Sequence, residues 1–93
     1  MEINLNLDGN NLYREESFTD LKVGAIRKLT PVTNDGSIDK SRDPIFMAHT
    51  QVMSPEGPFQ VSCLIKTKTL PEAIEKFPEK MGMELKKVMD ASQ

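Results

Sequence analysis

Cys63 and His49 are the residues whose types could act as a nucleophile and its base, because a thiolate needs a neighbouring proton acceptor. They fall in two segments, residues 45–54 and 59–68, that alternate apolar and polar side chains and should pair as a hairpin around the turn at 55–58. The alternation puts Cys63 on the inward row and His49 on the outward row, so their side chains should project to opposite faces of the sheet. We therefore expect Cys63 to be a buried structural residue and assign no catalytic residue.

The acidic loop at residues 33–44 is the next candidate for chemistry. Asp35, Asp39 and Asp43 recur every four residues, but this spacing does not match the alternate-residue ligands and terminal glutamate of a calcium loop. One cysteine and one histidine cannot supply a closed four-ligand zinc shell without carboxylates. The loop also lacks the glycine spacing and the Lys-Ser/Thr ending of a phosphate-binding loop. The sequence predicts no metal and no cofactor.

Four lysines form the best case for a ligand surface, because the strand periods place them on one outward face. Such a face could hold RNA or another anion, but the outward row lacks the exposed aromatic residues on which sheet-based RNA readers stack bases. The net charge of −2 gives no general positive field for nucleic acid. A nucleic-acid or anion-binding module is therefore kept as an alternative function. Its ligand surface would be Lys22, Lys28, Lys66 and Lys68.

The first half of the chain predicts two strands. Residues 1–7 alternate Ile3, Leu5 and Leu7 with polar residues, which indicates a half-buried strand, and residues 8–11 carry turn chemistry. Residues 12–17 are charged and are expected to be a connector. A second strand is predicted over residues 18–32, with Gly24 as a bulge or a close backbone approach. Its inward row would be Leu21, Val23, Ala25 and Leu29, with Ile26 facing outward.

The clearest predicted element is a C-terminal helix that begins after Thr69. Thr69 can cap it, and Glu72 stands three residues later as in a capping box. Pro78 falls inside the apolar stripe, so we expect either a kink or a second helical segment that begins there. The stripe at helical spacing is Leu70, Ala73, Ile74, Phe77, Met81, Leu85, Val88 and Met89.

Composition limits the class of protein. A chain of 93 residues fits a single domain with a thin core, and we treat residues 1–93 as one α+β domain with a mobile loop at 33–44. No apolar stretch approaches the roughly 20 residues that span a bilayer, and the N-terminus has no basic and apolar export signal. Cys63 is the only cysteine, which is ordinary in a reducing compartment. We expect a soluble, cytoplasmic protein without a membrane partner.

These patterns predict an α+β fold: a small, mostly antiparallel sheet of about four strands with one kinked C-terminal helix packed on one face. The other sheet face is left over, and its half-apolar outward row suggests an interface. We expect a non-enzymatic interaction module that forms a homodimer or binds a protein partner through its sheet. A small enzyme using His49 is the alternative from the enzyme class. The expected interface residues are Ile26, Met47, His49, Met53 and Leu64.

Overall fold

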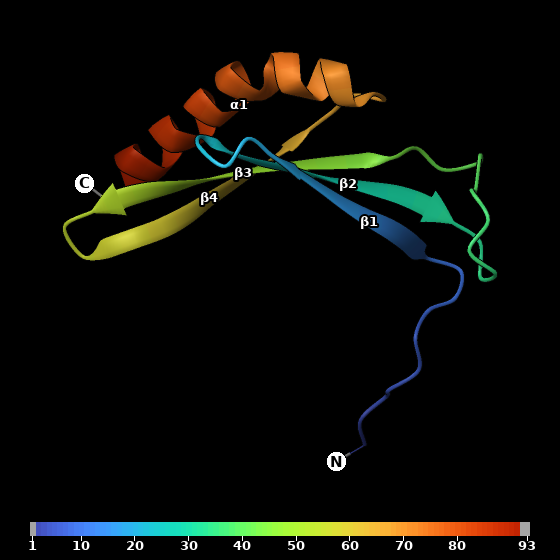
Figure 1. The fold of residues 1–93 in the computed structure, drawn as a ribbon. Helices are drawn as coiled ribbons and strands as arrows, with labels where there is room; N and C mark the ends of the chain where they lie inside the picture. Colours follow the sequence, from blue (N-terminus) through green and yellow to red (C-terminus); the bar gives the residue numbers. More distant parts are fainter. Residues whose placement is uncertain (1, 92–93) are drawn as a thin grey trace.

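Four antiparallel strands and one helix follow one another along the chain in the computed structural model, which describes residues 2–91 (Figure 1). The sheet order is β1-β2-β3-β4, so each strand pairs with its neighbour in sequence. The helix α1 lies across one face of the sheet, which confirms the predicted α+β fold. The elements are β1 (Leu12–Thr19), β2 (Gly24–Val32), β3 (Ile45–Ser54), β4 (Gly57–Ile65) and α1 (Leu70–Ala91).

The predicted hairpin between β3 and β4 is confirmed. Ser54 and Gly57 are register partners on either side of Pro55 and Glu56. Gly57 has a φ of 116°, a left-handed conformation that glycine adopts without a steric penalty. The hairpin sets the register of the two strands, and that register fixes which of their side chains face the helix.

The first half of the chain differs from the prediction. The expected single strand over residues 18–32 is two strands, separated by a turn at 20–23, and the expected connector at 12–17 belongs to β1. Asp20 holds this turn, because its Oδ1 accepts the backbone N–H groups of Lys22 and Val23 at 2.9 and 2.8 Å. Residues 2–7 of the expected first strand form no strand, and Met1 lies outside the described residues.

The turn also reverses the predicted facing of β2. Ile26 pairs with Ala48 on the helix side, whereas Ala25 and Leu29 face away from the helix. A shift of one residue turns every side chain of a strand to the other face. The prediction failed because it counted Leu21 and Val23 as inward strand residues, although both lie in the turn.

The core lies between the sheet and α1. Burying each large apolar side chain contributes roughly 1.5–3 kcal/mol to folding, so this layer provides the main stabilisation of a small domain. Cys63, Phe77 and Leu85 pack against it as partly buried residues. The buried cluster is Ile26, Phe46, Ala48, Val61, Ile65, Ala73 and Met81.

The helix begins and continues as the sequence indicates, with one difference. The Thr69 hydroxyl accepts the Glu72 N–H at 3.4 Å, whereas the Glu72 carboxylate binds the Thr67 hydroxyl at 2.7 Å. Pro78 lies inside a single helix that bends over the sheet (Figure 1), so the alternative of a second segment beginning there was wrong. Within residues 2–91, no helix has the length and apolar character of a membrane-crossing segment.

Candidate interaction surface

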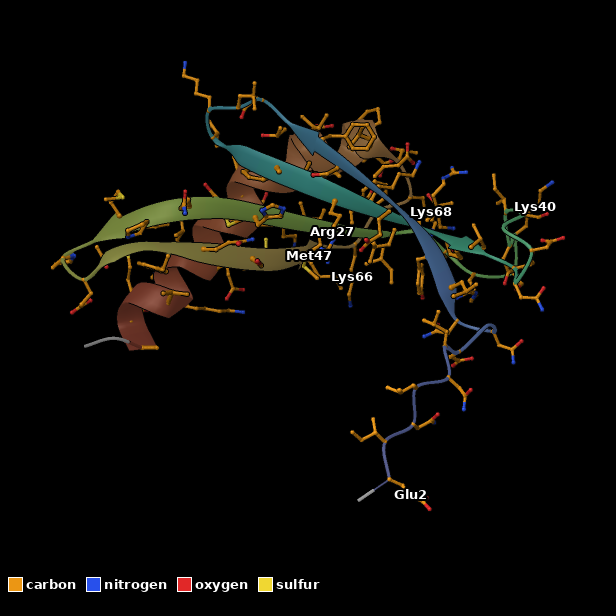
Figure 2. The ribbon with its side chains drawn as sticks, turned by 60° about the horizontal axis from the view of Figure 1, so that its bottom comes forward. Glu2, Arg27, Lys40, Met47, Lys66 and Lys68 are labelled. Atoms are coloured by element: carbon orange, nitrogen blue, oxygen red, sulfur yellow. The ribbon has the colours of Figure 1, made fainter. Side chains whose placement is uncertain are left out.

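The sheet face opposite α1, which we call the outer face, is the candidate site. Strand register places Arg27, Met47 and Leu64 in one row across β2, β3 and β4, and His49 beside Ser62 in the next. Figure 2 shows Arg27 and Met47 next to each other on this face. The only helix among residues 2–91 lies on the other side of the sheet. No helix among residues 2–91 therefore covers the outer face.

Apolar side chains stand at both ends of the half of the outer face that β3 and β4 form, with the polar pairs His49–Ser62 and Gln51–Gln60 between them. Met47 and Leu64 are cross-strand partners, and Leu64 is 49% exposed. Met53, further along β3, is 76% exposed. The half-buried Ile45 continues the patch toward the start of β3. Exposed apolar groups that lie together on one face mark an interaction site more often than isolated ones do.

Charges on the outer face are confined to the half that β1 and β2 form. Arg27 Nε lies 3.7 Å from Glu15 Oε1, with 47% and 63% of the two side chains exposed. An exposed ion pair of this kind contributes little to stability, because water and salt screen it. Residues 57–65 of β4 carry no charge. The face is thus uncharged and partly apolar on one side and charged but balanced on the other.

The structure places four of the five predicted interface residues on the outer face. Met47, His49, Met53 and Leu64 alternate on β3 and β4 as the sequence indicates, and their role in an interface stays a prediction. The predicted outward facing of Ile26 was wrong. Its side chain is 5% exposed and packs beneath the helix, because the turn at 20–23 changes the facing of β2.

The four predicted ligand-surface lysines do not share a face. The Lys28 Nζ lies on the helix side, 6.0 Å from the centre of the Phe46 ring. Lys22 is in the turn between β1 and β2, and Lys66 and Lys68 follow β4 in the connection to α1 (Figure 2). The prediction of a common lysine face was therefore wrong. The turn at 20–23 accounts for Lys22 and Lys28, whereas Lys66 and Lys68 lie beyond Ile65, where β4 ends before the predicted residue 68.

Cys63 and His49 lie on adjacent strands but on opposite faces. Cys63 pairs with Ala48 on the helix side, and His49 pairs with Ser62 on the outer face. Burial, with the nearby Glu84 carboxylate, raises the pKa of the Cys63 thiol, while Lys80 acts against this rise. A raised pKa lowers the fraction of reactive thiolate. The pair therefore does not form a nucleophile with its base.

Two aspartates of the loop at 33–44 accept hydrogen bonds from within the loop. Asp35 accepts hydrogen bonds from the Thr33 hydroxyl and the Ser37 N–H, and these lower its pKa to about 2. Asp39 accepts from Ser41 and Arg42, with the same effect on its pKa. Residues 2–91 contain no group of three or more His, Cys, Asp or Glu side chains placed to hold a metal ion.

The sequence did not predict an apolar groove of about 470 Å³ between the β1–β2 turn and the first half of α1. Phe18, Ile74 and Phe77 line it, and the first two are 39% and 57% exposed. The helix contacts β2, β3 and β4 but not β1, so the helix-side residue Phe18 stays uncovered. The one sequence signal for this groove is Ile74, which belongs to the apolar stripe of the helix although the sheet does not cover it.

Comparisons of the chain with protein-family models, with curated proteins and with solved structures give no match. Inference about function therefore rests on the geometry of the outer face.

Proposed function

We propose that this protein is a non-enzymatic interaction module that forms a homodimer through the outer face of its sheet. The observation that carries the proposal is the neighbouring pair of a half-buried Met47 and an exposed Leu64, on β3 and β4 of a sheet face that no helix among residues 2–91 covers. A twofold interface brings the same patch of both copies together, so a patch that is apolar and neutral is compatible with itself.

The balanced charges support the same proposal. A homodimer would bring two identical charge distributions together, and an unbalanced face would repel its copy. On the outer face, the Arg27 guanidinium is already paired with Glu15 of the same copy. A cytoplasmic location belongs to the proposal as well, because a single cysteine suits a compartment without structural disulfides.

Light scattering after size-exclusion chromatography tests the proposal across a series of protein concentrations, at low and high salt. We expect a mass of twice the 10.5 kDa chain. The dimer should persist at high salt, because apolar contacts are not screened as exposed charges are. A monomer at every concentration would overturn the proposal.

A pair of matched variants locates the interface. Leu64→Lys places a charge beside Met47 on the outer face, where Leu64 is 49% exposed, and should shift the protein toward the monomer. Met83→Lys makes the same kind of change on α1, at a side chain that is 53% exposed, and should leave the dimer intact. Circular dichroism checks that both variants fold. A Leu64→Lys variant that stays dimeric at all concentrations would contradict the assignment of the interface to this face.

A further inference from the structure

Residues 2–7, which we call the N-terminal arm, expose an apolar row that the rest of residues 2–91 does not cover. Ile3, Leu5 and Leu7 are 71%, 87% and 90% exposed, and asparagines separate them. This alternation is typical of a strand with one buried face. The side-chain hydrogen bonds of the arm are local: the Asn4 side-chain oxygen accepts from both the backbone N–H and the side-chain amide of Asn6. The arm thus has the pattern of a strand without a sheet.

The arm does not turn back onto its own β1. The Asn11 N–H donates to the Asp8 carbonyl at 3.1 Å, which closes a turn over Gly9 and Asn10. Residues 2–7 form no strand and take part in none of the pairings of the sheet. The arm therefore separates from β1, and Figure 1 shows it leaving on the side of the sheet away from α1.

The two edges of the sheet differ in charge. The edge strand β1 carries Arg14, Glu15 and Glu16 among its 8 residues. The other edge strand, β4, has 9 residues and no charge. Charged side chains and proline protect an edge from the addition of a further strand. The β4 edge has Pro58 near its start and no charge, so its second half, toward Ile65, is the less protected edge. Residues 3–7 of the arm are also uncharged, which matches β4 and not β1.

We propose that the N-terminal arm of one copy adds as a fifth strand to the β4 edge of a second copy. This inference rests on the proposed homodimer. When two outer faces stack about a twofold axis that runs parallel to the strands between β3 and β4, the apolar halves face each other and β4 of one copy lies over β3 of the other. The free edge of β4 then lies over β2 of the other copy, next to its β1. Stacked sheets are about 10 Å apart, and six extended residues span about 20 Å. The turn at 8–11 and the arm therefore suffice to cross to the partner sheet and run along its edge.

The register follows from the ends of the strands. Leu12, where β1 begins, and Ile65, where β4 ends, lie toward the same end of the sheet through the pairings of β2 and β3. The arm would therefore enter beside Ile65 of the partner copy and run parallel to β4. Asn4 then lies near Ser62 of that copy. In this register Leu5 and Leu7 lie beside Cys63 and Ile65, whose side chains face the helix, so the apolar row of each arm would extend the core layer of the other copy.

Cross-linking between single-cysteine chains tests this contact. In a Cys63→Ala background, the Asn4→Cys variant is mixed with a tagged Ser62→Cys variant and treated with a short bifunctional maleimide, so that a mixed dimer is identified by its mass. The matched control pairs Asn4→Cys with Ser17→Cys, which is on the outer face of β1. We expect a mixed dimer with Ser62→Cys at several times the yield with Ser17→Cys. Equal yields, or a larger yield with Ser17→Cys, would overturn the inference.

A second pair of variants measures how much the arm contributes to association. Leu5→Asp, at the middle of the apolar row, should raise the dissociation constant of the dimer at least tenfold. Asn10→Asp adds the same charge in the turn and should change the dissociation constant little. If neither variant changes the constant and no selective cross-link forms, the arm inference fails while a wild-type dimer still supports the proposed function. A wild-type protein that is monomeric at every concentration would overturn both the arm inference and the proposed function.

Discussion

Arg42 ties together three segments at one end of the sheet. Its Nη2 donates to the carbonyls of Leu12 and Val32 at 3.0 and 2.9 Å, where β1 begins and β2 ends. Its Nε lies 3.0 Å from the Asp39 carboxylate, and its guanidinium stacks 5.0 Å from the centre of the Tyr13 ring. One planar group thus satisfies two carbonyls, a carboxylate and an aromatic face.

Arg42→Lys is expected to destabilise the fold, because a lysine ammonium cannot reach both carbonyls and stack on Tyr13 at once. We expect the free energy of unfolding to fall by about 1–3 kcal/mol, the usual cost of leaving such groups unpaired. Urea denaturation measures it. Arg14→Lys is the control, since the exposed Arg14 pairs with Glu16 only at 3.8 Å. An equal loss in both variants would contradict a special role of Arg42.

The carboxylates of the same loop predict the behaviour in acid. The pKa of Asp39 is lowered from 3.8 to about 2, first by the Ser41 hydroxyl and N–H and then by Arg42. A lowered pKa in the folded state means that the stabilisation is present above pH 3.8 and is lost as the pH falls toward 2. The melting temperature should therefore decrease over this range, and less steeply in Asp39→Asn. Thermal melts followed by circular dichroism measure both slopes, and equal slopes would count against the assignment.

At the scale of the elements, the close approach anticipated at Gly24 is confirmed. A Cβ at this position would overlap the carbonyl oxygen of His49 and lie 3.1 Å from Phe77 Cζ. The β2–β3 pairing and the helix therefore approach the same backbone position.

Gly24→Ala should lower the free energy of unfolding by about 1–3 kcal/mol, since overpacking forces the backbone or Phe77 to move. Gly82→Ala should raise it by about 0.5–1 kcal/mol, because alanine has the higher helix propensity. A Cβ at Gly82 meets nothing within 4 Å. Chemical denaturation of the two variants should therefore give changes in the free energy of unfolding of opposite sign. A stabilising Gly24→Ala would contradict the close approach at Gly24.

The elements that were predicted correctly have strong local signals. The Pro-Glu-Gly-Pro turn and the Thr69 cap determine β3, β4 and α1 from neighbouring residues. The turn between β1 and β2 has no such signal, because Leu21 adopts a φ of 59° that leucine rarely takes. The Asp20 side chain stabilises that turn by accepting the backbone N–H groups of Lys22 and Val23. The sequence around Asp20 does not indicate this role. The error at Ile26 and Lys28 follows from this one turn.

At the scale of the whole molecule, the outer face could be predicted only where the strand register was right. The rows on β3 and β4 follow from alternation within a hairpin, so Met47 and Leu64 were placed correctly. The apolar groove could not be predicted, because it depends on how far the helix extends over the sheet. Phe18 and Ile74 meet there only through tertiary packing.

A homodimer makes the stability of the chain depend on its concentration. The melting temperature should rise with protein concentration, because association removes folded monomer from the unfolding equilibrium. Leu64→Lys should remove this dependence, and Met83→Lys should keep it. Differential scanning calorimetry over a hundredfold range of concentration measures the effect. A wild-type melting temperature that does not change with concentration would contradict the dimer.

The order of the elements has a consequence for synthesis of the chain. The helix that covers the core is the last element, and its 22 residues take roughly 1–4 s to be made at ribosomal rates. Hairpins form within microseconds, so the sheet can pair before α1 emerges. During that interval Phe46 and Ile65 face water on one side of the nascent sheet, while Met47 and Leu64 do so on the other. The nascent chain therefore presents two apolar faces at once, and it is most exposed to aggregation and to chaperones just before the helix docks.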